Sequence, residues 1–194
     1  MSTGVRVSLA SATEIAEELV RALGPGCERI EVAGSIRRRM PDVGDIELVA
    51  VPRLHAETHR EGLFEERSTE VDELQVALDA LLADGTLMAH PFDPKRGPRY
   101  SKLVHVASGI QVDLFSARPE TFGLILAIRT GPPAYSRWLV TEARDRGHHV
   151  ADGELHVGRI GCTPFRPCPR IPTPEEADVY RALGLFYPIP EQRS

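Results

Sequence analysis

Cysteine is scarce in this sequence, and its scarcity excludes a small domain held together by a disulfide framework. The three cysteines, Cys27, Cys162 and Cys168, are too few and odd in number for such a framework. We therefore expect ordinary thiols in a reduced compartment. A metal clip is the alternative for the last two cysteines, because three histidines lie near them in the chain: His148, His149 and His156.

Long apolar runs and an excess of positive charge are also missing. The sequence has no run of about 18 apolar residues, so we expect neither a transmembrane helix nor a membrane partner. The N-terminus lacks a basic segment followed by an apolar one, so we expect no signal peptide and a cytoplasmic location. The formal net charge of −5 argues against a non-specific nucleic-acid binder that relies on phosphate neutralisation.

The charges that are present are unevenly distributed along the 194 residues. Acids outnumber bases between residues 53 and 90, whereas arginines outnumber acids between residues 129 and 172. We expect one acidic end and one modestly basic end. The length suits one medium domain, or one domain with a small appendage.

Apolar periodicity divides the chain into helices and strands. Helices are expected over residues 11–24, 69–85, 119–131, 133–147 and 174–184, the first with a capping box formed by Ser11 and Glu14. Strands are expected over residues 28–34, 45–51 and 86–90, and hairpins over 100–117 and 149–158. Charged or Pro-rich stretches predict loops over residues 53–67 and 91–99, followed at the C-terminus by an extended tail. A domain boundary is expected between residues 118 and 131.

Three acids stand on two of the expected strands. Side chains alternate along a strand, so Asp45 and Glu47 share one face while Ile46 points to the other. In the hairpin, Asp113 shares a face with Gln111. If the two strands are neighbours, three carboxylates converge, which is unfavourable unless a cation neutralises them. Oxygen ligands suit Mg²⁺, and two such ions can support an in-line phosphoryl displacement.

A glycine-serine turn precedes the acids. Gly34 and Ser35 follow an expected strand, where exposed backbone amides can cradle phosphates. Arg38 can add a bidentate contact to a phosphate. The alternative interpretation is structural: the arginines at 37–39 form a solvated turn, and Asp113 is a strand-edge acid.

The stretch from Gly34 to Glu47 resembles the signature of the DNA polymerase X family, which is Gly-Ser, two arginines, a short loop and Gly-Asp-x-Asp. The sequence VDLF around Asp113 is similar to the family's third-carboxylate strand, and Arg129-Thr130-Gly131 resembles its aromatic-Thr-Gly turn. Residues 175–193 resemble the family's C-terminal sequence.

The resemblance implies an α+β fold in two parts. Residues 1–118 would form a nucleotidyltransferase palm, with a mixed β-sheet flanked by helices. Residues 119–194 would form a small thumb of helices and a short hairpin. The family's lyase and helix-hairpin-helix domains are not expected, because the palm begins almost at residue 1.

The resemblance also implies a role for individual residues. Asp45 and Glu47 would be catalytic ligands of two Mg²⁺ ions, for which Mn²⁺ can substitute, and Asp113 would bind the catalytic ion. Ser35 and Arg38 would hold the β- and γ-phosphates. The complete set of implied nucleotide-binding residues is Gly34, Ser35, Arg38, Gly44, Thr130 and Gly131. Contacts with DNA would come from Arg129, Ser136 and Arg137, and a further phosphate contact from Arg6.

The implied activity is DNA-directed DNA polymerisation by a monomer, from a dNTP onto gapped or nicked DNA, with low fidelity. Three positions depart from the family pattern, namely Glu47 for Asp, Arg129 for an aromatic residue and Pro132 for Ser. Two alternatives keep the chemistry: a different acceptor, such as RNA, protein or a small molecule, or template-independent terminal transfer. A further alternative has no catalytic activity: a degenerate palm that only binds a partner.

Overall fold

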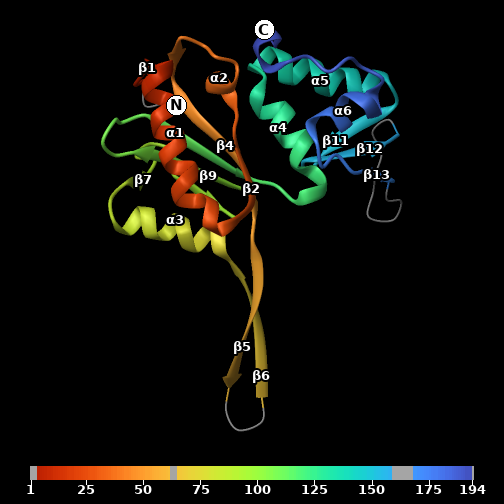
Figure 1. Ribbon diagram of the computed structural model, residues 1–194. Helices are drawn as coiled ribbons and strands as arrows, with labels where there is room; N and C mark the ends of the chain where they lie inside the picture. The colour runs from red at the N-terminus through yellow and green to blue at the C-terminus, as the bar shows by residue number, and fades with distance from the viewer. Residues whose placement is uncertain (1–3, 62–64, 159–167, 194) are drawn as a thin grey trace.

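A mixed β-sheet lies at the centre of the N-terminal part of the protein (Figure 1). The computed structural model describes residues 4–61, 65–158 and 168–193. The sheet has the strand order β2-β4-β10-β9-β7, and β8 pairs with β9. Strand β4 runs parallel to β10, and the other neighbours are antiparallel. The expected α+β architecture, with a mixed sheet flanked by helices, is therefore confirmed.

The strands of this sheet are short and come from most of the N-terminal sequence. They are β2 (Cys27–Val32), β4 (Asp45–Pro52), β7 (Leu87–Ala89), β8 (Lys95–Gly97), β9 (Tyr100–His105) and β10 (Gln111–Ser116). The predicted hairpin over residues 100–117 is confirmed as β9 and β10. Strand β8 lies inside the stretch 91–99 that was predicted to be a loop, and its three residues have no apolar alternation to mark it.

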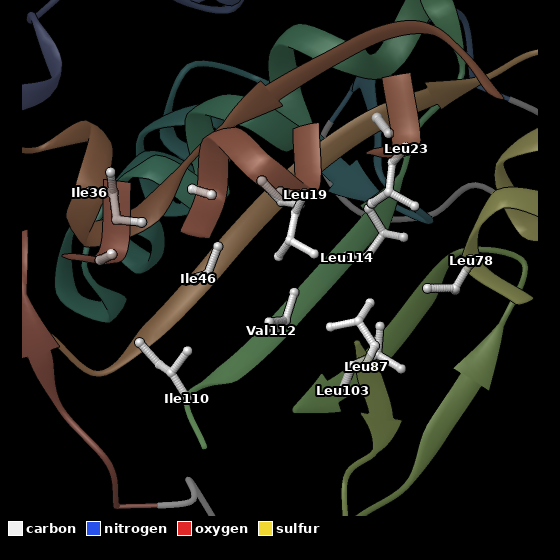
Figure 2. Close-up of a cluster of buried hydrophobic side chains, with 14 of the residues drawn as sticks. Leu19, Leu23, Ile36, Ile46, Leu78, Leu87, Leu103, Ile110, Val112 and Leu114 are labelled. Atoms are coloured by element: carbon white, nitrogen blue, oxygen red, sulfur yellow. The ribbon is translucent and has the colours of Figure 1, made fainter. Parts of the chain in front are cut away.

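Two helices, α1 (Leu9–Leu23) and α3 (Glu73–Ala83), cover one face of the sheet. Ile46 and Val112 point from β4 and β10 toward Leu19 and Leu78 of these helices, as Figure 2 shows. All four side chains are almost completely buried. Because each buried aliphatic side chain of this size contributes roughly 1.5–3 kcal/mol, this layer fixes which face of β4 points inward.

The first helix begins earlier than predicted, and the capping box of Ser11 and Glu14 is wrong. The N-cap is Ser8, whose Oγ accepts a hydrogen bond from the Ser11 backbone N–H at 3.2 Å. Strand β1 (Val7–Ser8) pairs with β3 (Asp42–Val43) and holds Ser8 extended, as an N-cap requires. That pairing joins distant residues, so the local sequence could not reveal it.

A two-stranded ribbon replaces the loop that was predicted over residues 53–67. Strands β5 (Leu54–Glu61) and β6 (Glu65–Asp72) pair antiparallel and project away from the body of the molecule (Figure 1). The described side chains of Leu54–Thr58 and 68–70 are exposed. The prediction failed because strands whose described side chains are exposed on both faces show no apolar alternation in the sequence. Helix α3 consequently begins at Glu73, with Asp72 as its N-cap.

The C-terminal part contains three longer helices and a second, small sheet. The helices are α4 (Phe122–Thr130), α5 (Pro133–Asp145) and α6 (Glu176–Leu183), and the sheet consists of β11 (His148–Ala151), β12 (Glu154–Val157) and β13 (Arg170–Ile171). Short helical turns are α2 (Gly34–Arg37), η1 (Gly24–Gly26), η2 (Pro119–Thr121) and η3 (Pro190–Gln192), the last within the tail predicted to be extended. Leu124, Leu139, Leu155 and Val179 share a hydrophobic cluster of their own. Within the described residues, no helix combines the length and apolar character needed to cross a membrane.

The cysteines differ from one another. Cys27 is a buried free thiol, and burial followed by the charge of Asp72 raises its pKa to about 11. Cys168 is disulfide-bonded, so the prediction of a free thiol is wrong there. An odd cysteine count argues against a complete framework, but it does not exclude a single bridge. A disulfide-bonded Cys168 also cannot be the thiolate ligand of the alternative metal clip, and Cys162 lies outside the described residues.

Candidate active site

The parallel pairing of β4 with β10 brings the three predicted carboxylates onto one face of the sheet. Glu47 lies opposite Asp113 in the register, and Asp45 lies opposite Gln111. Because Ile46 and Val112 point into the core under α1 and α3, the carboxylates point to the other face.

Helix α4 packs on part of that face. Phe122 and Leu126 of α4 pack on Val49 and Phe115, which follow the carboxylates along β4 and β10. Glu47 and Asp113 line a cleft of about 970 Å³, whose lining also includes Arg129 and residues of the small sheet. The cleft therefore runs along this sheet face from the carboxylates to Phe115, beside α4.

Burial, followed by neighbouring negative charge, opposes the ionisation of Asp45 and Glu47. Burial, followed by the charges of Asp45 and Asp113, raises the pKa of Glu47 to about 8. Burial, followed by the charge of Asp113, also raises the pKa of Asp45. Arg129 and Arg38 lower the pKa of Glu47, but they do not offset the opposing effects. Burial and neighbouring negative charge therefore favour the protonated form of Glu47 near neutral pH.

Asp113 is held by two hydrogen bonds from neighbouring side chains. Tyr100 Oη donates to Oδ1 and Gln111 Nε2 donates to Oδ2, each at 2.8 Å. Burial, then the hydrogen bond to Asp113 and its charge, raise the pKa of Tyr100 well above its usual range, so the phenol remains a donor. Gln111 was predicted to lie on this face, whereas the contact from Tyr100 was not predicted. The signal for Tyr100 was the hairpin register, which pairs it with Phe115.

The glycine-serine turn lies directly beside Glu47. Gly34 begins α2 with a φ of +62°, a conformation that favours glycine. A Cβ atom on Gly34 would lie 2.2 Å from Glu47 Oε2, so only glycine allows this close approach. Ser35 Oγ is buried and has no hydrogen-bond partner among the residues that the structure describes. The fold therefore places the expected phosphate cradle and the expected metal ligands next to each other.

The turn formed by Arg129, Thr130 and Gly131 lies against the arginines that follow the Gly34-Ser35 turn. Arg38 Nη1 donates to the carbonyl of Thr130, and Arg37 Nη1 donates to Thr130 Oγ1 at 2.8 Å. Thr130 is completely buried, and its hydroxyl accepts the hydrogen bond from Arg37. Gly131 lies beside the ring of Tyr135, where a Cβ would come within 2.4 Å of Cδ1. These contacts connect α2 with the end of α4.

The residues expected to contact DNA lie in different environments. Arg129 is exposed, and its guanidinium lies 3.9 Å from the centre of the Phe115 ring. Ser136 Oγ donates to the carbonyl of Ile128 at 2.6 Å and so caps the end of α4. Arg137 is exposed on α5.

The remaining phosphate-contact candidate, Arg6, lies at the edge of the site. It forms an ion pair with Asp42, while Nη1 lies 3.1 Å from where a Cβ of Gly44 would be. Gly44 thus gives Arg6 room beside the start of β4, next to Asp45.

The donor set suits a hard divalent cation. No three histidine, cysteine, aspartate or glutamate side chains in the described part of the chain are already gathered as a metal site. The three carboxylates nevertheless share one face, and burial followed by the neighbouring negative charges raises the pKa values of Asp45 and Glu47. Carboxylate oxygens are the protein ligands that Mg²⁺ prefers, so a bound divalent cation would relieve this repulsion.

Comparison with models of known protein families and with curated proteins finds no match to this chain. The resemblance to the DNA polymerase X family therefore rests on the motifs quoted above. Since one fold can host many activities, function has to be inferred from the geometry and chemistry of the site.

Proposed function

We propose that the protein is a nucleotidyltransferase of the DNA polymerase X type, with a palm over residues 1–118 and a thumb over residues 119–194. It transfers a nucleoside monophosphate from a dNTP to the 3′-hydroxyl of gapped or nicked DNA. The observation that carries the proposal is the juxtaposition of three carboxylates on one sheet face with the Gly34-Ser35 turn, beside a cleft that Glu47 and Asp113 line.

The chain supplies ligands on one side of the reaction centre and phosphate contacts on the other. Asp45, Glu47 and Asp113 would hold Mg²⁺ or Mn²⁺, which when bound neutralises charge on the reacting oxygens. Ser35, with its unpartnered hydroxyl, and Arg38 would hold the β- and γ-phosphates. Arg38 uses one nitrogen on the Thr130 carbonyl, and a guanidinium has further N–H donors for phosphate.

The reaction at this site is a displacement at the α-phosphorus. The 3′-hydroxyl oxygen forms a bond to that phosphorus, and the bond from the phosphorus to the oxygen bridging to the β-phosphate breaks. The bridging oxygen leaves with pyrophosphate, and the hydroxyl proton is released. Ser35 and Arg38 lie on the leaving-group side in this assignment, and Asp113 lies on the side of the attacking hydroxyl.

One observation favours a second candidate, template-independent addition to a DNA end. Ser136 was expected to face the base pair or template, but its hydroxyl donates to a backbone carbonyl of α4. Pro132, the N-cap of α5, and Pro133, its first residue, contribute no backbone N–H for a contact there. Less of the protein is then available to read a template.

Incorporation of labelled dNTPs with Mg²⁺ or Mn²⁺ tests the proposal. Gapped duplex DNA, single-stranded DNA and RNA are the acceptors to compare. We expect transfer to DNA, and we expect Asp113→Asn to lower it about 1,000-fold or more, because several kcal/mol of charge stabilisation is lost. Asp79→Asn, on the outer side of α3 with an exposed side chain, is the matched control and should retain activity.

The choice of acceptor separates the candidates. Preference for gapped duplex supports template-directed synthesis, and preference for a single strand supports terminal addition. Transfer to RNA alone would replace the DNA assignment. Wild-type activity in Asp113→Asn would refute the site assignment.

A further inference from the structure

The orientation of Asp113 is fixed from two sides of its carboxylate. Oδ1 accepts the hydrogen bond of Tyr100 and Oδ2 accepts that of Gln111, both at 2.8 Å. A carboxylate oxygen can accept more than one hydrogen bond or ligand, so each oxygen keeps a lone pair for a cation. Two donors on different oxygens leave little freedom for rotation about the bond to the carboxyl group.

Tyr100, which donates to Asp113 Oδ1, is not the residue that lies directly opposite Asp113 on β9. Lys102 occupies that position in the register, but its Nζ donates to Asp93 Oδ2 at 3.0 Å. Tyr100 lies opposite Phe115, and it reaches Asp113 across the diagonal between the strands. Diagonal neighbours in an antiparallel pair are within reach of an aromatic side chain.

The ring of Tyr100 is itself held in place. It stacks on Phe115 with the ring centres 4.9 Å apart and the planes at 13°. The guanidinium of Arg129 lies over Phe115 at 3.9 Å, and Lys95 Nζ lies 5.9 Å from the centre of the Tyr100 ring. The stacking of Tyr100 on Phe115 therefore holds the phenol oxygen in position to donate to Asp113.

We propose that Tyr100 is a positioning residue for nucleotidyl transfer, because its hydroxyl fixes the Asp113 carboxylate in the orientation that receives the cation. This inference rests on the proposed function. Residues that hydrogen-bond to a metal ligand typically change metal affinity or activity by about tenfold to 100-fold when they are replaced. Gln111 is the second donor and acts on the same carboxylate.

Tyr100→Phe isolates the hydroxyl, because the aromatic ring and its stacking on Phe115 are retained. Mn²⁺ binding to the nucleotide-free protein, followed by electron paramagnetic resonance, should weaken by about tenfold or more. In steady-state assays, kcat should fall and recover at high Mn²⁺, while the KM for dNTP stays close to that of the wild type. The midpoint of thermal unfolding should change little.

Tyr187→Phe is the matched control. Tyr187 Oη donates to a carboxylate outside the site, Glu176 Oε2, at 2.7 Å. Its replacement removes the same kind of hydrogen bond, and Mn²⁺ affinity should stay unchanged. Gln111→Met removes the other donor to Asp113. Because both donors act on one carboxylate, the free-energy effects of Tyr100→Phe and Gln111→Met should not add in the double variant.

The outcomes distinguish this inference from the proposed function. Wild-type Mn²⁺ affinity and kcat in Tyr100→Phe, with an active wild-type protein, would overturn the positioning role and leave the proposed function intact. Equal weakening in Tyr187→Phe would also overturn it, since the effect would not be specific to Asp113. A wild-type protein that neither binds Mn²⁺ nor transfers nucleotides would overturn the proposed function, and the inference with it.

Discussion

At Glu47, burial acts together with two neighbouring carboxylates to oppose ionisation. The pKa of its side chain is about 8, against an ordinary value of 4.5. The longer side chain, compared with the aspartate of the family pattern, reaches the Gly34 turn, where Oε2 occupies the space of the missing Cβ. Glu47 thus lies where the two halves of the site meet.

This raised pKa predicts an unusual pH dependence of stability in metal-free protein. Between about pH 4.5 and pH 8 the folded state binds more protons at Glu47 than the unfolded state, so this contribution to the free energy of unfolding falls as pH rises. Glu47→Gln should match the wild type near pH 5 and exceed it by about 2–4 kcal/mol near pH 9. Urea unfolding with a chelator at both pH values measures this.

The control for this effect is Glu14→Gln, at an exposed position on α1. It should leave the pH dependence unchanged. Parallel profiles for Glu47→Gln and the wild type would contradict the prediction. Adding Mg²⁺ should reduce the difference between the two proteins near pH 9, since the cation stabilises the ionised carboxylate of the wild type.

A second prediction at the residue scale concerns Gly34. An alanine there adds the strain of a positive φ and a methyl group 2.2 Å from Glu47 Oε2. Gly34→Ala should lower the free energy of unfolding by about 2–4 kcal/mol and reduce nucleotidyl transfer more than tenfold. Thermal or urea unfolding and the incorporation assay measure the two effects.

Gly85→Ala separates the two contributions. Gly85 has a φ of +80°, but a Cβ there meets no atom within 4 Å. The control should lose about 1–2 kcal/mol from backbone strain alone and keep its activity. An equal loss of activity in both variants would argue against the crowding of Glu47.

At the scale of elements, the sequence predicted correctly those strands that bury one face in the core. The alternation of Asp45, Ile46 and Glu47 predicted a strand and its two faces correctly, because one face is packed under helices. The approach of Tyr100 to Asp113 was not predictable, since it depends on hairpin register and on the reach of a side chain. The β5–β6 ribbon escaped prediction because its described side chains over residues 54–58 and 68–70 are exposed on both faces.

Hydrogen bonds at the base of the ribbon attach it to the body. Asp72 accepts a hydrogen bond from the Gln75 backbone N–H at 3.0 Å, and the backbone of Arg53 bonds to Gly26 and Glu73. An isolated two-stranded ribbon is marginally stable at best, so its structure depends on this anchor.

Shortening the ribbon should therefore leave the rest of the fold intact. Replacing residues 56–70 with Asn-Gly keeps the pair His55 and Val71 as the closing pair of a tight hairpin. The described side chains that would be removed are exposed, so the free energy of unfolding should change by less than about 1 kcal/mol. Urea unfolding measures this, and a loss of several kcal/mol would show that the ribbon supports the body.

At the scale of the whole molecule, one buried carboxylate joins segments that are distant in the chain. Glu176 of α6 accepts hydrogen bonds from Arg193, Arg37 and Tyr187. Burial opposes its ionisation, but the hydrogen bonds from Arg193 and Tyr187 outweigh burial and lower the pKa of Glu176. The C-terminal segment, α6 and the arginine turn of α2 are thereby held together.

Removing this charge should destabilise the protein strongly. Glu176→Gln leaves the Arg193 guanidinium, whose side chain has no exposed surface, without a carboxylate. Breaking one partner of a buried ion pair costs about 3–5 kcal/mol. Glu191→Gln breaks the 3.1 Å pair with Arg39, which is 77% exposed, and should cost at most about 1 kcal/mol. Similar urea midpoints for the two variants would contradict this assignment.

The parallel pairing of β4 with β10 also has a consequence for folding kinetics. The two strands are far apart in the chain, with the ribbon, α3, β7, β8 and β9 between them. Non-local pairings of this kind form slowly, so we expect the carboxylates to come together late, after local helices and hairpins have formed. A slip of β4 by one residue would turn Asp45 and Glu47 into the layer of Leu19 and Leu78. Because buried charges in that hydrophobic layer would be unfavourable, the layer selects the strand register that assembles the site.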